Sequence, residues 1–93
     1  MFTTRFRIKN RPRPRSLYGN LIAYMQHRLE EKPANLRLRL SLVSHLQEAG
    51  RYEEAIAQVQ HILRANPEHR RAKGLLLRLK LEQRLARIHR RRN

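Results

Sequence analysis

Two prolines, Pro33 and Pro67, lie 34 residues apart, and Gly50 stands midway between them. Proline lacks a backbone donor and disfavours helix in the residue before it, while glycine ends helices readily. The three residues divide this chain of 93 residues into four segments, and the two between Pro33 and Pro67 each have a length usual for one helix. A chain of this length has room for one small domain, so its fold must be built from these short segments.

Apolar residues recur at helical spacing in all four segments. Leu17, Leu21, Met25 and Leu29 repeat every four residues, which predicts a helix from an N-cap at Ser16 to about residue 32. Further helices are expected over about residues 34–49, 52–65 and 68–90. The apolar positions of the last helix are Ala72, Leu75, Leu76, Leu77, Leu79, Leu81, Leu85 and Ile88.

The segment that ends at Pro67 carries a recognisable pattern of two small residues and one aromatic residue. Gly50, Tyr52 and Ala55 stand at fixed spacing inside the run Gly-Arg-Tyr-Glu-Glu-Ala. Residues 36–69 resemble the tetratricopeptide repeat, a family with a period of about 34 residues. The resemblance implies an all-α fold of antiparallel helical hairpins, with about four helices over residues 16–93 and a degenerate half-repeat on each side of the full one.

Three positions depart from the family pattern. Arg39 stands where a large aromatic residue is frequent, and Val43 replaces a small one, which leaves some loosening of the helix pair open. Arg84 replaces the turn glycine of the following half-repeat, so the last helix is expected to continue through it. Stacks of about three repeats are usual. A partner that covers the remaining faces and a self-sufficient fragment are both consistent with the sequence.

The net charge of +15 lies at the two ends of the chain. Residues 1–15 carry six cations and no acid, residues 16–69 carry six of each, and residues 70–93 carry ten cations and one acid. This layout predicts salt-sensitive association with a polyanion.

The first fifteen residues are predicted to form an extended basic arm. Alternate side chains of an extended backbone share one side, which places the cations opposite Phe6 and Ile8. Two roles remain open: a clamp between phosphate strands, or a strand added to a partner's sheet through Phe6 and Ile8. The cations of the arm are Arg5, Arg7, Lys9, Arg11, Arg13 and Arg15.

A second basic surface is expected on the last helix. On a helical wheel, five of its cations fall within about 40° of one line and span about 27 Å. We favour a phosphate-contacting stripe over a merely solvated face. The cations predicted to bind a polyanion here are Lys73, Lys80, Arg84, Arg87, Arg90, Arg91 and Arg92.

Members of the family often bind peptides in a concave groove lined by the first helix of each pair. The resemblance therefore implies partner docking at Arg37, Ser44, Gln47, Arg71 and Arg78. The paired Lys and Asn of the family's carboxylate-binding subgroup are absent, so capture of short peptides is not expected.

The residue types do not indicate an enzyme, a metal-binding protein or a membrane-spanning protein. The chain has no Cys and no Asp, its three Ser residues form no catalytic set, and its five His residues include no i,i+4 pair. No cofactor or metal is therefore expected. No apolar run is long enough to span a membrane. The start of the chain is rich in Arg, but Pro12 and Pro14 argue against a transit-peptide helix. We expect a cytoplasmic protein, with an organelle matrix as the alternative.

The sequence as a whole predicts a non-catalytic interaction module, a small basic subunit or adaptor of a larger assembly. Structured RNA in a ribonucleoprotein is the leading partner. The alternative is a scaffold or assembly subunit of a multiprotein complex, including one at a membrane face, which docks on an acidic protein surface with the arm as an added strand or clamp.

Overall fold

The described part of the chain consists of four helices. The computed structural model describes the backbone of residues 15–92 and the side chains of residues 19–89. The helices are α2 (Arg15–Glu31), α3 (Leu36–Glu48), α4 (Tyr52–Ala65) and α5 (Arg70–Arg92). Residues 15–92 contain no strand. The prediction of an all-α fold with about four helices is therefore confirmed, while residues 1–14 of the predicted arm lie outside the described residues.

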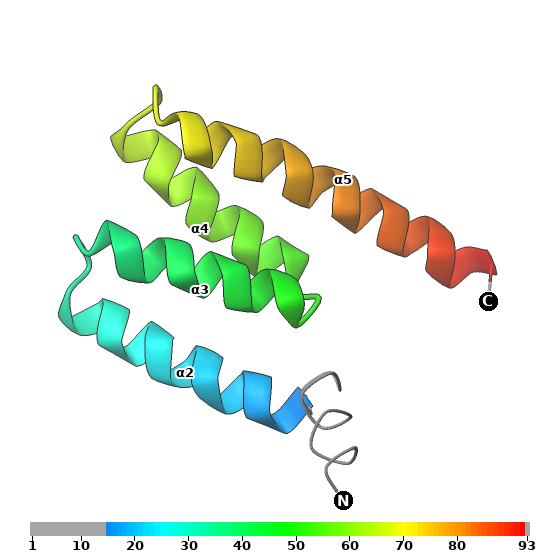
Figure 1. Ribbon diagram of the computed structural model, residues 1–93, viewed down its shortest axis with the longest axis horizontal. Helices are drawn as coiled ribbons and strands as arrows, with labels where there is room; N and C mark the ends of the chain where they lie inside the picture. Colours follow the sequence, from blue (N-terminus) through cyan, green and yellow to red (C-terminus); the bar gives the residue numbers. More distant parts are fainter. Residues whose placement is uncertain (1–14, 93) are drawn as a thin grey trace, which may run out of the picture.

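Neighbouring helices run in opposite directions and lie side by side in chain order (Figure 1). α2 packs on α3, α3 on α4, and α4 on α5, which gives the antiparallel helical hairpins that the sequence predicts. α5 has 23 residues against 14 in α4, so its C-terminal part projects beyond the other helices (Figure 1).

The core is one cluster of aliphatic side chains to which every helix contributes. α2 and α3 supply larger side chains, α4 presents Ala55 and Val59 at the helix contacts, and α5 adds only Ala72 and Leu79. Val43, which replaces a usual small residue, is fully buried in this cluster. The buried apolar residues are Ile22, Met25, Leu29, Leu42, Val43, Leu46, Ala55, Val59, Ile62, Ala72 and Leu79.

The turn between α3 and α4 depends on Gly50. Its φ of 75° lies in the left-handed region, which side chains with a Cβ rarely adopt. The Arg51 N–H donates to Leu46 O at 2.9 Å and the Gly50 N–H to Gln47 O at 3.0 Å. These two bonds form a Schellman motif, which satisfies the last carbonyls of α3 and turns the chain into α4.

Helix starts differ from the predictions by a few residues. α2 contains Arg15 and Ser16, so Ser16 is not its N-cap and Arg15, assigned to the arm, is helical. α3 begins at Leu36 because Asn35, not an earlier residue, caps it: the Asn35 Oδ1 accepts from the Leu38 N–H at 3.0 Å. α5 begins at Arg70, where the His69 Nδ1 accepts from the Ala72 N–H at 3.1 Å. α4 covers the predicted residues.

Four of the eight apolar positions expected along α5 are exposed. Leu77, Leu81, Leu85 and Ile88 have exposed fractions of 73%, 55%, 55% and 47%. The reason is that, within residues 15–92, only one side of α5 is covered by the other helices. Within the same residues, the apolar side chains on the other side of α5 therefore have no neighbouring helix to pack against.

Candidate interaction surfaces

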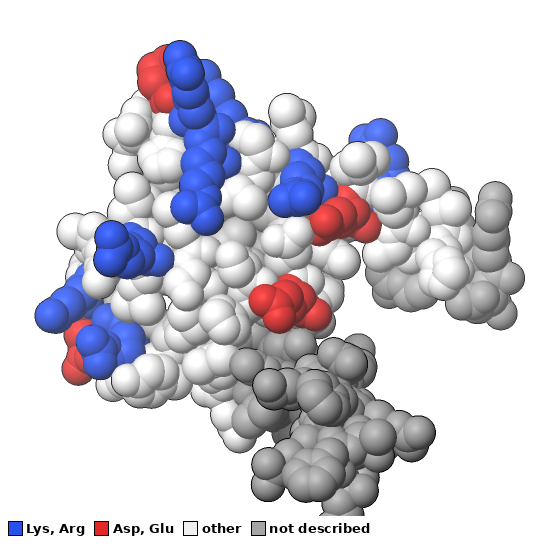
Figure 2. Space-filling model, in the orientation of Figure 1, with Lys and Arg blue, Asp and Glu red and all other residues white. Residues whose placement is uncertain are grey.

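A shallow groove between α3 and α5 brings together three of the predicted docking residues. Arg37 and Ser44 from α3 and Arg71 from α5 line a depression of about 600 Å³ together with Leu36, Leu40 and Ser41. Lys and Arg side chains gather over this part of the molecule, at the start of α5 and at the α2–α3 end (Figure 2). Two guanidinium groups beside a hydroxyl and leucine side chains provide donors for a carboxylate and a small apolar contact.

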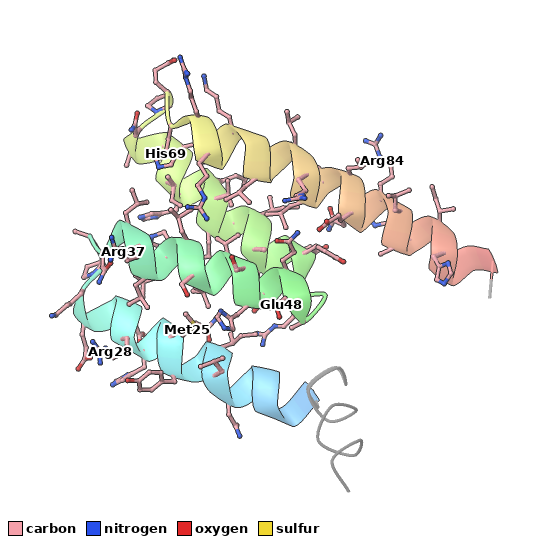
Figure 3. All side chains as sticks on the ribbon, viewed as in Figure 1. Met25, Arg28, Arg37, Glu48, His69 and Arg84 are labelled. Carbon is pink, nitrogen blue, oxygen red and sulfur yellow. The ribbon has the colours of Figure 1, made fainter. Side chains whose placement is uncertain are left out.

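The other two predicted docking residues, Gln47 and Arg78, are engaged within the protein. The Gln47 Nε2 donates to the Glu82 Oε1 at 2.7 Å, and the Arg78 Nε lies 4.0 Å from the Glu82 Oε2. Together they connect α3 to α5 at the end of the groove where Glu48 lies (Figure 3). The groove is therefore cationic at one end and carries carboxylates at the other.

The described members of the predicted basic stripe of α5 differ in their surroundings. Lys80 and Arg84 are exposed and have no ion-pair partner among the described side chains. Arg84 points away from α3 and α4 (Figure 3). The Lys73 Nζ lies 3.4 Å from the Glu68 Oε2, and Arg87 lines a hollow together with Glu53 and Glu54. Among the described side chains of the stripe, Lys80, Arg84 and Arg87 are therefore exposed without an ion pair.

Four exposed apolar residues form an apolar stripe beside these cations. Leu77, Leu81, Leu85 and Ile88 are spaced by four, four and three residues, which places them along one line of α5. The sequence identified these four residues as apolar positions of the helix but did not predict an exposed apolar surface. The signal that could have revealed it is the width of the apolar sector of α5, which exceeds what one covering helix can bury.

Arg39 is the other site residue that the sequence did not predict. It is 8% exposed, and its Nη1 donates to the Gln58 Oε1 at 2.6 Å while its Nη2 donates to the Pro33 carbonyl at 2.9 Å. Burial lowers the pKa of the Arg39 guanidinium. In place of a large aromatic residue, a hydrogen-bonded cation therefore joins α3 to α4 and to the α2–α3 turn.

Some predicted residues are not placed by the structure. The cations Arg5, Arg7, Lys9, Arg11 and Arg13 and the apolar pair Phe6 and Ile8 lie outside the described residues, as do the side chains of Arg15, Arg90, Arg91 and Arg92. Over the described range, no group of three or more His, Cys, Asp or Glu residues is arranged to hold a metal ion. In the same range, no helix has the length and apolarity needed to cross a membrane.

Comparison with known protein families identifies the tetratricopeptide repeat. The sequence model of the tetratricopeptide repeat matches residues 22–79, more than half of the chain, and thus includes the segment from α2 to the middle of α5. Comparison with curated proteins finds no significant match, and comparison with solved structures finds none either.

Proposed function

The chain belongs to the tetratricopeptide repeat family, and we propose that it is a non-catalytic adaptor that docks on an acidic partner protein through the cationic surface of α5. Repeats of this family are protein-interaction modules, which fits a helical core that is neutral over residues 16–69. The proposal adds the chemistry of the partner and the surface that meets it.

The alternation of cations and leucines on α5 carries this proposal. Lys80 and Arg84 are exposed directly beside Leu77 and Leu81, whose exposed fractions are 73% and 55%. A phosphate backbone needs the cations but leaves the leucines in water. A protein surface satisfies both, because burial of apolar area contributes roughly 25 cal/mol per Å² while carboxylates pair with the cations.

Structured RNA in a ribonucleoprotein is the second candidate partner. It is supported by the excess of ten cations over one acid in residues 70–93 and by the cations of residues 1–15, which suit a phosphate backbone. In this case the chain is a small basic subunit whose two ends are anchored on RNA. A cytoplasmic location, with an organelle matrix as the alternative, belongs to both proposals.

Fluorescence anisotropy with two probes separates the candidates. A glutamate-rich helical peptide and a structured RNA hairpin are titrated with the full chain over a range of salt concentrations. The acidic-partner proposal expects peptide binding with a shallow dependence of log K on log salt. Binding of the RNA alone, with a steep slope that does not depend on RNA sequence, overturns it in favour of RNA.

Charge reversal locates the binding surface. The double variant Lys80→Glu, Arg84→Glu is expected to weaken peptide binding by about tenfold or more, because it replaces two attractions by two repulsions. Arg64→Glu changes an exposed cation on α4 and serves as the control, with an expected change below about twofold. Equal losses in both variants mean that net charge alone attracts the peptide and contradict the proposed surface.

A further inference from the structure

The 34-residue period allows α5 to be compared with α3 position by position. The buried residues of α3 are Arg39, Leu42, Val43 and Leu46. The residues 34 positions later are Lys73, Leu76, Leu77 and Lys80. In α5, Leu76 is half-buried and the other three are exposed. The same positions of the repeat are therefore covered in α3 and uncovered in α5.

In α3, α4 covers these positions together with α2, which lies beside Arg39 and Leu42. The Arg39 Nη1 donates to the Gln58 Oε1 of α4 at 2.6 Å, and Val43 and Leu46 share one core cluster with Ala55 and Val59 of α4. α3 can be covered in this way because the chain turns at Gly50. The equivalent position in α5 is Arg84, where the helix continues, and within residues 15–92 no further helix packs on this side of α5. We call Lys73, Leu77, Lys80 and Arg84 the open face.

We propose that the open face binds an acidic amphipathic helix of a partner protein, which packs on α5 as α4 packs on α3. The inference rests on the proposed function, since it specifies the form of the acidic partner and the place where it docks. An exposed leucine, Leu77, at a position that the repeat buries in α3 indicates a helix-packing surface, and the cations indicate the charge of its occupant.

The contact between Arg39 and α4 shows what such a helix must provide. Arg39 stays beneath α4 because Gln58 offers an oxygen acceptor. Lys73, at the equivalent position, requires an acceptor in the same place. Lys80 replaces Leu46 two helical turns further on, about 10 Å away. A partner helix with two carboxylates about two turns apart, on either side of an apolar residue that meets Leu77, satisfies all three side chains.

Charge argues against a second copy of this chain as the occupant. Residues 70–93 carry nine more positive than negative charges, so two α5 helices packed together repel each other. RNA pairs with Lys80 and Arg84 but leaves Leu77 exposed to water. An anionic membrane surface accepts both cations and leucines, so it forms a separate arm of the test.

The test uses a peptide built from the chain itself. A helix-stapled peptide with the sequence of α4, carrying the substitution Gln58→Glu, is titrated into the full isotope-labelled chain, and amide chemical shifts are followed by NMR. The expected shifts lie at Lys73, Leu77, Lys80 and Arg84. The matched control peptide keeps Gln58 and is expected to bind about tenfold more weakly, because its acceptor carries no charge.

Two variants of the chain test both components of the contact. Leu77→Gln and Lys80→Glu alter exposed side chains, so the fold is retained, which circular dichroism checks. Each is expected to weaken binding of the substituted α4 peptide by about tenfold, whereas Arg64→Glu changes it by less than about twofold. An unchanged affinity in Leu77→Gln shows attraction by charge alone and overturns the packing of a helix on the open face.

The site of the shifts distinguishes failure of this inference from failure of the proposed function. Shifts at Arg37, Ser44 and Arg71 place the acidic peptide in the α3–α5 groove, which overturns the inference but supports an acidic partner. No binding of any acidic peptide, with binding of the RNA hairpin, overturns both. Binding of phosphatidylserine vesicles that depends on Leu77, without binding of the peptide, overturns both in favour of a membrane surface.

Discussion

Gln47 and Glu82 are 35 residues apart in the sequence, and their side chains are joined by a hydrogen bond of 2.7 Å between Nε2 and Oε1. Glu82 is the one acid in α5, and the bond directs its carboxylate towards α3. The cations on the opposite side of α5 are therefore left without an acid on their own helix. The same bond ties α5 to the first helix of the preceding hairpin.

A double-mutant cycle on this pair measures its contribution to stability. Gln47→Ala and Glu82→Ala are each expected to lower the free energy of unfolding by about 1 kcal/mol, since the bond is partly buried and one partner is charged. Because the two residues interact directly, the double variant should lose less than the sum of the single losses. Urea unfolding measures all four proteins, and strict additivity would contradict the coupling.

Because Arg39 and Gln58 are in contact, substitutions of the two residues are expected to lower the stability of the fold by different amounts. Gln58→Leu removes an acceptor from a buried guanidinium and is expected to cost about 2–3 kcal/mol. Arg39→Met removes the charge and keeps the volume, so its expected cost is about 1 kcal/mol. Thermal unfolding of both variants checks the order. The opposite order would mean that the cation itself, more than its pairing, stabilises the helix contact.

Substitution of two glycines by alanine is expected to change the stability of the fold in opposite directions. Gly50→Ala forces a Cβ into a residue with φ of 75° and is expected to destabilise the fold by about 1 kcal/mol. Gly74→Ala lies within α5, where an added Cβ meets no atom within 4 Å, and is expected to stabilise by up to about 1 kcal/mol. Chemical denaturation of both variants checks the signs. A neutral Gly50→Ala would contradict the role given to the turn.

The Arg51–Glu54 pair is expected to make a small contribution to the free energy of unfolding that depends on pH. The hydrogen bond from Arg51 lowers the pKa of the Glu54 carboxyl below its ordinary value of 4.5. The stabilisation is therefore present above that value and is lost as the pH falls through the lower folded-state pKa. Glu54→Gln should be less stable than the wild type by about 0.5 kcal/mol or less at neutral pH, since both side chains are more than one-third exposed.

A pH series of thermal unfolding tests this assignment. The difference between the wild type and Glu54→Gln should shrink to zero in acid, where Glu54 is protonated and equivalent to an amide in charge. Glu53→Gln is the control, because its carboxylate stands next in sequence and forms no ion pair with a described residue. A difference that persists in acid would assign the effect to packing and not to charge.

The sequence predicted the fold well because its signals are local. Pro67 and Gly50 impose helix ends through their own backbone geometry, and Ala55 marks the close contact of two helices. The caps were harder to predict. Asn35 and His69 each compete with polar neighbours for the same role, and only the direction of the side chain decides which residue accepts the first N–H.

The surfaces were predicted only in part, because they depend on which side of each helix is covered. Arg37, Ser44 and Arg71 line one groove, whereas the Gln47 side chain donates a hydrogen bond to Glu82, 35 positions later in the chain. The exposure of Leu77 was not predicted, because a helical wheel shows that a residue is apolar but not whether a neighbouring helix exists to bury it. That information lies in the tertiary arrangement.

The projecting half of α5 has a consequence for local stability. Beyond Arg84, Leu85 and Ile88 are exposed, so the last turns of this helix are held mainly by their own backbone hydrogen bonds. Their amide protons should exchange with solvent faster than those of α3 and α4, whose side chains form the core. Any ligand that lies along α5 would slow this exchange, so the amide exchange rates of α5 would show whether a ligand is bound there.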